Sequence, residues 1–113
     1  MRAPPLAELV RLDDAAFRSL FTKSPVKRIG RDRFIRNVLT AIGNADDIAL
    51  ADEARRLLDD ESPLVRGAAV WALSQLMAPD EFAALAADAI STETDASVRA
   101  EWQLSQSDVA SSP

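Results

Sequence analysis

The feature that most constrains the fold of this 113-residue chain is a pattern that recurs about every 31 to 33 residues. "SPLVRG" (62–67) recurs as "DASVRA" (95–100), 33 residues later. In the same way "FIRNVLTAIGN" (34–44) aligns with "VRGAAVWALSQ" (65–75). A period of this length, with two helices in each unit, is typical of a helical solenoid, in which stacked units cover one another's apolar faces. A plain helical bundle with coincidental similarities is the alternative.

Helical periodicity dominates the whole chain, and no window alternates apolar and polar residues as a strand would. We predict about six helices in three pairs. The predicted segments are Leu6 to Phe21 as one or two short helices, Ile29 to Asn44, Asp47 to Asp59, Pro63 to Leu76, Pro79 to Ile90, and a last helix from Asp95 or Ser97 around Val98 and Trp102. Ser62 is a predicted N-cap, and Gly43-Asn44 is a predicted helix stop. The two tryptophans, Trp71 and Trp102, are expected to pack between units, with a binding hot spot as the alternative.

Missing residue types exclude several kinds of chemistry. The chain has no cysteine and no histidine, so it offers no thiolate ligand, no cysteine nucleophile and no imidazole base. The acidic segment "DDES" (59–62) lacks the glycine turn of a metal loop and fits an N-cap region better. We therefore predict no catalytic residue and no metal site in this chain. Because no apolar run reaches the roughly 18 residues of a membrane span and the first residues do not form a signal peptide, a cytoplasmic location is expected.

Charge is divided unevenly along the sequence. Residues 1–40 hold nine basic and four acidic side chains, a balance of +5, whereas residues 41–113 hold four basic and fourteen acidic ones, a balance of −10. Six of the 13 basic residues lie between Lys23 and Asn37. Such an asymmetry favours a polyanion-binding region beside a solubilising remainder.

The predicted helix over 29–44 places some of these basic residues on one side. Its apolar residues are Phe34, Ile35, Val38, Leu39 and Ile42. Packing that stripe inward points Arg33, Arg36 and Asn37 outward together with Thr40 and Asn44. Arginine and asparagine suit phosphate oxygens and sugar hydroxyls. No aromatic residue is interleaved with them, so base stacking is not expected. A solvated face neutralised by Asp13, Asp14 or Asp32 is the alternative.

Two sets of residues resemble known families. The "VR" dipeptide before an alanine-rich stripe, as in "PLVRGAAVWAL", resembles HEAT repeats. The segments "LVRLDDAAFRSLF" (9–21), "SPVKRIGRDRFIRNVLTAIGN" (24–44) and "DDESPLVRGAAVWALSQL" (59–76) resemble the C-terminal part of epoxyqueuosine reductases. The resemblance covers roughly residues 6–78, with R-x-R-F-x-R-N followed by A-I-G-N as its most specific part.

The resemblance implies an all-α fold, a short α-α superhelix of HEAT-like repeats. We expect a repeat domain over residues 1–104, divided into leading helices (1–22), a first unit with the basic helix (23–59) and later repeats (60–104). A frayed polar tail would follow over 105–113.

The resemblance also implies a function. Epoxyqueuosine reductases reduce the epoxide of epoxyqueuosine in tRNA, with cobalamin and two [4Fe–4S] clusters held in an N-terminal catalytic part. This chain would then bind the anticodon stem-loop region of tRNA and work with that catalytic domain, with no membrane or DNA partner. The implied RNA contacts are Lys27, Arg28, Arg31, Arg33, Arg36 and Asn37, with Lys23 and Arg66 as secondary candidates. A protein–protein scaffold of the HEAT type remains the alternative.

Overall fold

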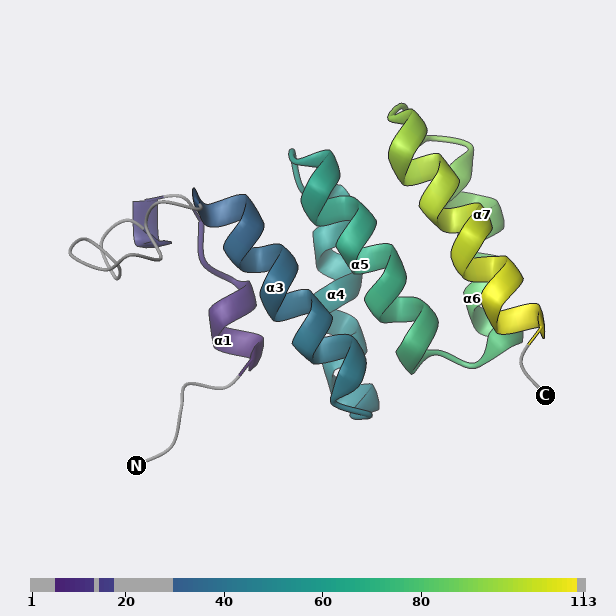
Figure 1. Cartoon of the computed structure of the whole chain (residues 1–113), viewed down its shortest axis with the longest axis horizontal. Coiled ribbons are helices and arrows are strands. Elements are labelled where there is room, and N and C mark those ends of the chain that lie inside the picture. The colour runs from purple at the N-terminus through teal and green to yellow at the C-terminus, as the bar shows by residue number, and fades with distance from the viewer. Residues whose placement is uncertain (1–5, 14, 18–29, 112–113) are drawn as a thin grey trace.

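The computed structural model describes residues 6–13, 15–17 and 30–111, with side-chain detail as far as Gln106, and these residues form helices without a strand. The elements are α1 (Leu6–Val10), α3 (Gly30–Asn44), η2 (Ile48–Leu50), α4 (Ala51–Arg56), η3 (Leu57–Asp59), α5 (Pro63–Leu76), α6 (Pro79–Ile90) and α7 (Ala96–Ser111). Helices α3, α5 and α7 lie side by side in one layer, and α4 and α6 lie behind them (Figure 1). The predicted all-α repeat fold is confirmed.

The basic helix α3 is oriented by its apolar stripe. Ile35, Val38, Leu39 and Ile42 are buried, and Phe34 is half-buried with its ring 5.3 Å from that of Phe17. The stripe predicted from the sequence is therefore the one that packs into the core. Burial of these side chains fixes which side of α3 faces solvent.

Helix α5 buries a wider arc than the sequence predicted. The spacing along the sequence predicts one stripe of Val65, Ala69, Ala72, Leu73 and Leu76. The first four are buried and Leu76 is half-buried, and Val70 and Ser74 are buried as well. The reason is that α5 packs against α3 on one side and α7 on the other, and also against α4. A central helix of a repeat array has neighbours on three sides, whereas an amphipathic pattern predicts one buried side.

Two other segments differ from their predicted form. The predicted helix over 47–59 is a 3-10 turn, a short α-helix and a second 3-10 turn, opened by Asp47, whose Oδ1 accepts from the Ala49 N–H at 3.0 Å. Helix α7 runs on to Ser111, beyond the start of the predicted polar tail, and Ser105 is buried within it.

Helix α3 ends at Asn44, as predicted, but Gly43 is not the left-handed residue that follows its end. It lies inside the helix and is buried, and the left-handed residue after the helix is Asp46, with φ of 55°. A Cβ placed on Gly43 would overlap Cζ3 of Trp71 and lie 3.0 Å from its Cε3. Glycine is therefore needed here for the close approach of the α5 indole to α3.

Two glycine-to-alanine substitutions are expected to shift stability in opposite directions. Gly43→Ala should lower the free energy of unfolding by about 1–3 kcal/mol, because Trp71 must move away. Gly67→Ala should raise it by about 0.5–1 kcal/mol, since Gly67 lies in α5 with nothing within 4 Å of the added Cβ. Urea unfolding of both variants checks this pair, and equal shifts would contradict the assigned role of Gly43.

Candidate nucleic-acid interface

The outward side of α3 presents part of the predicted basic set. Arg33, Arg36 and Asn37 are exposed, as are Thr40 and Asn44. Nε and Nη2 of Arg36 donate to Oδ1 of Asn37 at 3.4 and 3.2 Å, which aligns the guanidinium along the helix surface. Within the described part of the chain, neither Arg33 nor Arg36 forms an ion pair with a carboxylate. Their charge is therefore available to a ligand.

Arg31 has a different environment. Its Nη1 and Nη2 lie 3.0 and 2.9 Å from the two carboxylate oxygens of Asp60, and its Nε donates to the Leu12 carbonyl at 2.9 Å. Nη1 also reaches Asp32 at 3.2 Å. Only 14% of its side chain is exposed. Arg31 thus differs from the exposed Arg33 and Arg36, which we call the outward pair, because the donors of Arg31 are engaged within the protein.

The charges of this pair are mutually stabilised. Burial disfavours ionisation of Asp60, but hydrogen bonds from Arg31 and from the Ser62 N–H outweigh it and lower the pKa of Asp60. Burial likewise opposes the charge on Arg31, and its bonds to Asp60 and Asp32 nevertheless raise the pKa of the guanidinium. Both groups stay charged at neutral pH.

The next unit repeats this arrangement. Nε and Nη2 of Arg66 donate to the two carboxylate oxygens of Glu93 at 2.9 and 3.0 Å, and Nη1 donates to the Asp60 carbonyl at 2.8 Å. Burial disfavours ionisation of Glu93, but Arg66 and the Asp95 N–H lower its pKa. Arg66, a secondary RNA candidate, is therefore paired with Glu93 in the lead-in to α7.

The two ion pairs define the register of the repeat, and we call them the inter-repeat ladder. In each, the acid lies two residues before a helix N-cap and accepts from the backbone N–H of that cap residue, Ser62 or Asp95. Arg99 is in the corresponding position of α7, with Nη1 donating to the carbonyls of Ile90 and Glu93 at 2.7 and 3.1 Å. Arg66 and Arg99 thus hold equivalent positions, each four residues after an N-cap, and Arg31 makes the matching ion pair from the second residue of α3.

The ion pair of α3 that matches Arg66–Glu93 is made by Arg31 and not by Arg36, which the sequence alignment placed beside Arg66. The signal was present in the acids: Asp60 and Glu93 each precede a cap residue by two positions. The other predicted contacts, Lys27 and Arg28, and the secondary candidate Lys23 lie outside the described residues.

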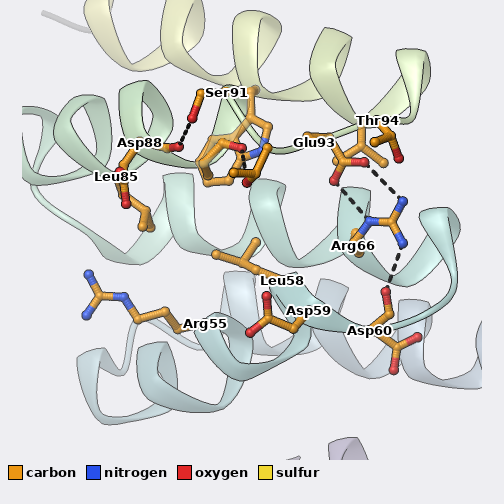
Figure 2. A pocket seen from close by; sticks show the side chains of 14 residues that line it. Arg55, Leu58, Asp59, Asp60, Arg66, Leu85, Asp88, Ser91, Glu93 and Thr94 are labelled. Atoms are coloured by element: carbon orange, nitrogen blue, oxygen red, sulfur yellow. Dashed lines mark hydrogen bonds and ion pairs between the residues drawn. The ribbon is translucent and has the colours of Figure 1, made fainter.

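A cavity of about 640 Å³ lies between the units and contains the Arg66–Glu93 pair (Figure 2). Leu58, Leu85 and Trp102 contribute to its apolar lining, and Asp59 and Asp88 carry further negative charge. None of Arg31, Arg33, Arg36 and Asn37 lines it. With more carboxylates than guanidiniums around it, this cavity is not a site for a polyanion.

The donor atoms of the chain do not fit an iron–sulfur cluster, because the sequence has no cysteine to supply thiolates. Among the described residues, no group of three or more carboxylates is placed to hold a metal ion. Within the same residues, no helix is long and apolar enough to cross a membrane.

Comparison with known proteins supports the sequence-based resemblance. A family model described as HEAT repeats matches residues 31–105. The epoxyqueuosine reductase of Xanthomonas campestris pv. campestris is 40% identical over 73 residues, covering 62% of this chain and 20% of the reductase. That of Escherichia coli K12 is 35% identical over 78 residues, covering 66% and 20%. This chain therefore spans about a fifth of the length of these relatives.

A solved structure shares the fold. The crystal structure of an epoxyqueuosine reductase with a tRNA-Tyr epoxyqueuosine-modified tRNA stem loop superimposes with a TM-score of 0.85 at 23% identity. The match covers 96% of this chain and 29% of that protein. The helical arrangement seen here is thus that of a HEAT-like part of a larger reductase.

Proposed function

This chain belongs to the HEAT repeat family, and from its similarity to epoxyqueuosine reductases we propose that it binds tRNA around the anticodon stem-loop. Its part is to hold the RNA for a separate catalytic domain of the same enzyme, in the cytoplasm. Cobalamin and the two [4Fe–4S] clusters would belong to that domain, since this chain lacks cluster ligands.

The observation that carries the proposal is the outward pair on α3. Arg33 and Arg36 are exposed on the same helix, beside Asn37, and no described carboxylate neutralises them. Guanidinium groups bind phosphate oxygens through two parallel hydrogen bonds. Lys27 and Arg28 precede this helix in sequence and would extend the cationic surface.

Recognition would depend mainly on phosphates. Each phosphate neutralised by a Lys or Arg side chain releases counterions, so that log affinity falls with log salt by about 0.7–0.9 per contact. We assign Arg31 a structural role, because its guanidinium is bound to Asp60 and this ion pair holds α3 in place. Reversing its charge would test the fold together with binding.

Reversing both outward charges is therefore the direct test. Arg33→Glu with Arg36→Glu is expected to weaken binding of an anticodon stem-loop by about tenfold or more and to reduce the salt slope by about 1–2. The matched control is Arg55→Glu with Arg56→Glu, the same charge change on exposed residues of α4 in the other layer. Fluorescence anisotropy at several salt concentrations measures both. Equal losses in the two variants would mean that only net charge matters.

A protein–protein scaffold is the second candidate, favoured by the acidic cavity between the units. The scaffold function would be favoured over RNA binding if the unaltered chain did not bind the stem-loop. It would also be favoured if the Arg33/Arg36 variant bound the stem-loop with unchanged affinity.

A further inference from the structure

We infer that Trp71 stacks on an unpaired base of the bound RNA, next to the phosphates held by α3; this rests on the proposed function. Such stacking would restrict the kind of RNA that can bind. A fully paired stem would satisfy the arginines of α3, whereas an aromatic contact requires a nucleotide whose base is free.

The first observation is the position of Trp71 in the repeat. Arg66 and Arg99 each lie four residues after a helix N-cap, so the residues five positions later, Trp71 and Leu104, are equivalent. Trp71 is half-buried and Leu104 is 63% exposed. Helices α3, α5 and α7 lie side by side (Figure 1), so Trp71 lies on the helix between α3, which carries the exposed Arg36, and α7, which carries Leu104.

The second observation is how the ring is held. Gly43 lets the indole lie against the backbone of α3, with Cε3 and Cη2 at 3.0 and 3.1 Å from where a Cβ would be. Gly43 is seven residues, or about two turns, after Arg36 on the same helix. The indole is thus fixed at the seam between α3 and α5, and part of it remains exposed. Trp102, by contrast, is 1% exposed and serves the core.

The third observation is the surface of α5 around Trp71. This helix contains no acidic residue, and its one cation, Arg66, is paired with Glu93. Its accessible residues near Trp71 are uncharged: Leu64 is 40% exposed, Gly67 and Ala68 are half-buried, and Gln75 is exposed. An RNA strand lying along α3 would therefore meet no repelling carboxylate on α5.

Together these features fit an RNA strand that lies along α3, with a phosphate at Arg36 and an unpaired base on the indole about two turns farther along the helix. Stacking of one base on an aromatic side chain is worth about 1–3 kcal/mol. The sequence alone predicted no base stacking, because no aromatic residue is interleaved with the basic residues of α3. The aromatic side chain comes from the neighbouring helix, which only the fold brings to α3.

The test uses the whole chain with Trp102→Phe, which leaves Trp71 as the single tryptophan, since the sequence has two. The probes are an RNA hairpin with an unpaired loop and a blunt RNA duplex of the same length. The hairpin is expected to quench Trp71 fluorescence by about half or more at saturation, as stacking does. The duplex is expected to bind through the phosphate contacts and leave the emission unchanged.

A second variant separates stacking from charge. Trp71→Leu is expected to weaken hairpin binding by about 5- to 150-fold, the equivalent of one stacked base, and to leave duplex binding unchanged. Circular dichroism verifies that each variant is folded. Leu104→Ala, at the equivalent position of α7, serves as the control. It is expected to change hairpin affinity by less than about threefold.

The outcomes distinguish the two proposals. Hairpin binding that depends on Arg33 and Arg36 but neither quenches Trp71 nor responds to Trp71→Leu would overturn the stacking inference and leave RNA binding intact. Equal quenching by hairpin and duplex would also overturn it. Absence of binding to either RNA would overturn both proposals.

Discussion

Replacing Trp102 with alanine is expected to lower the free energy of unfolding by about 3–5 kcal/mol, the largest effect of any single substitution considered for this chain. Trp102 is 1% exposed, and its ring lies 5.4 Å from that of Phe82 at an interplanar angle of 32°. The substitution removes most of a large side chain at the junction of α6 and α7. The surrounding helices can close only part of the space, so a cavity adds to the lost apolar burial.

Leu104→Ala provides the matched control for this prediction. Leu104 lies two residues later on α7 but is 63% exposed, so its truncation is expected to change stability by less than about 0.5 kcal/mol. Urea unfolding followed by circular dichroism measures both variants. A loss below about 1.5 kcal/mol for Trp102→Ala would show that α7 is less firmly packed than described.

Glu93→Gln is expected to lower the free energy of unfolding at pH 7 by about 1–3 kcal/mol, because it leaves the Arg66 guanidinium without its carboxylate. The side chains of Arg66 and Glu93 are only 15% and 9% exposed, so water replaces the lost bonds poorly. Glu61→Gln is the control, since Glu61 is exposed and in no described ion pair. It is expected to change stability by less than about 0.5 kcal/mol.

The two ion pairs, Arg66–Glu93 and Arg31–Asp60, set a dependence on pH. The pKa values of Glu93 and Asp60 are lowered in the folded chain from their ordinary values of 4.5 and 3.8. Groups with a lowered folded pKa contribute stability above the unfolded pKa and lose it as pH falls through the folded one. The stability of the unaltered chain should therefore fall between about pH 5 and pH 3. The difference from Glu93→Gln should shrink over the same range, and a constant difference would contradict this assignment.

Much of the fold could be predicted because amphipathic periodicity is a local property. The stripe of Ile35, Val38, Leu39 and Ile42 is set by spacing along one helix, and the structure buries it. Burial of Val70 and Ser74 could not be predicted in this way, because it depends on α5 lying between α3 and α7. The stop signal Gly43-Asn44 predicted the end of α3 at Asn44, but the indole of another helix explains why residue 43 is a glycine.

The candidate site, like the fold, could be predicted from the sequence only where it depends on one helix. The exposure of Arg33 and Arg36 follows from the helical wheel alone. The pairing of Arg31 with Asp60 joins residues 29 apart in sequence, and it forms only when one unit stacks on the next. Composition and local spacing cannot distinguish an arginine that contacts a ligand from one that joins two repeats. The recurrence of an acid two residues before a cap residue is the sequence signal that could have separated them.

The clamp on Arg31 has a consequence for inherited or engineered changes at a distance. Because Asp60 and the Leu12 carbonyl grip this side chain from two sides, α3 is prevented from rolling about its long axis. The orientation of Arg33 and Arg36 therefore depends on a carboxylate that is not itself a proposed RNA contact. Under the proposed function, a missense change at Asp60 is expected to weaken RNA binding while leaving every proposed phosphate contact chemically intact.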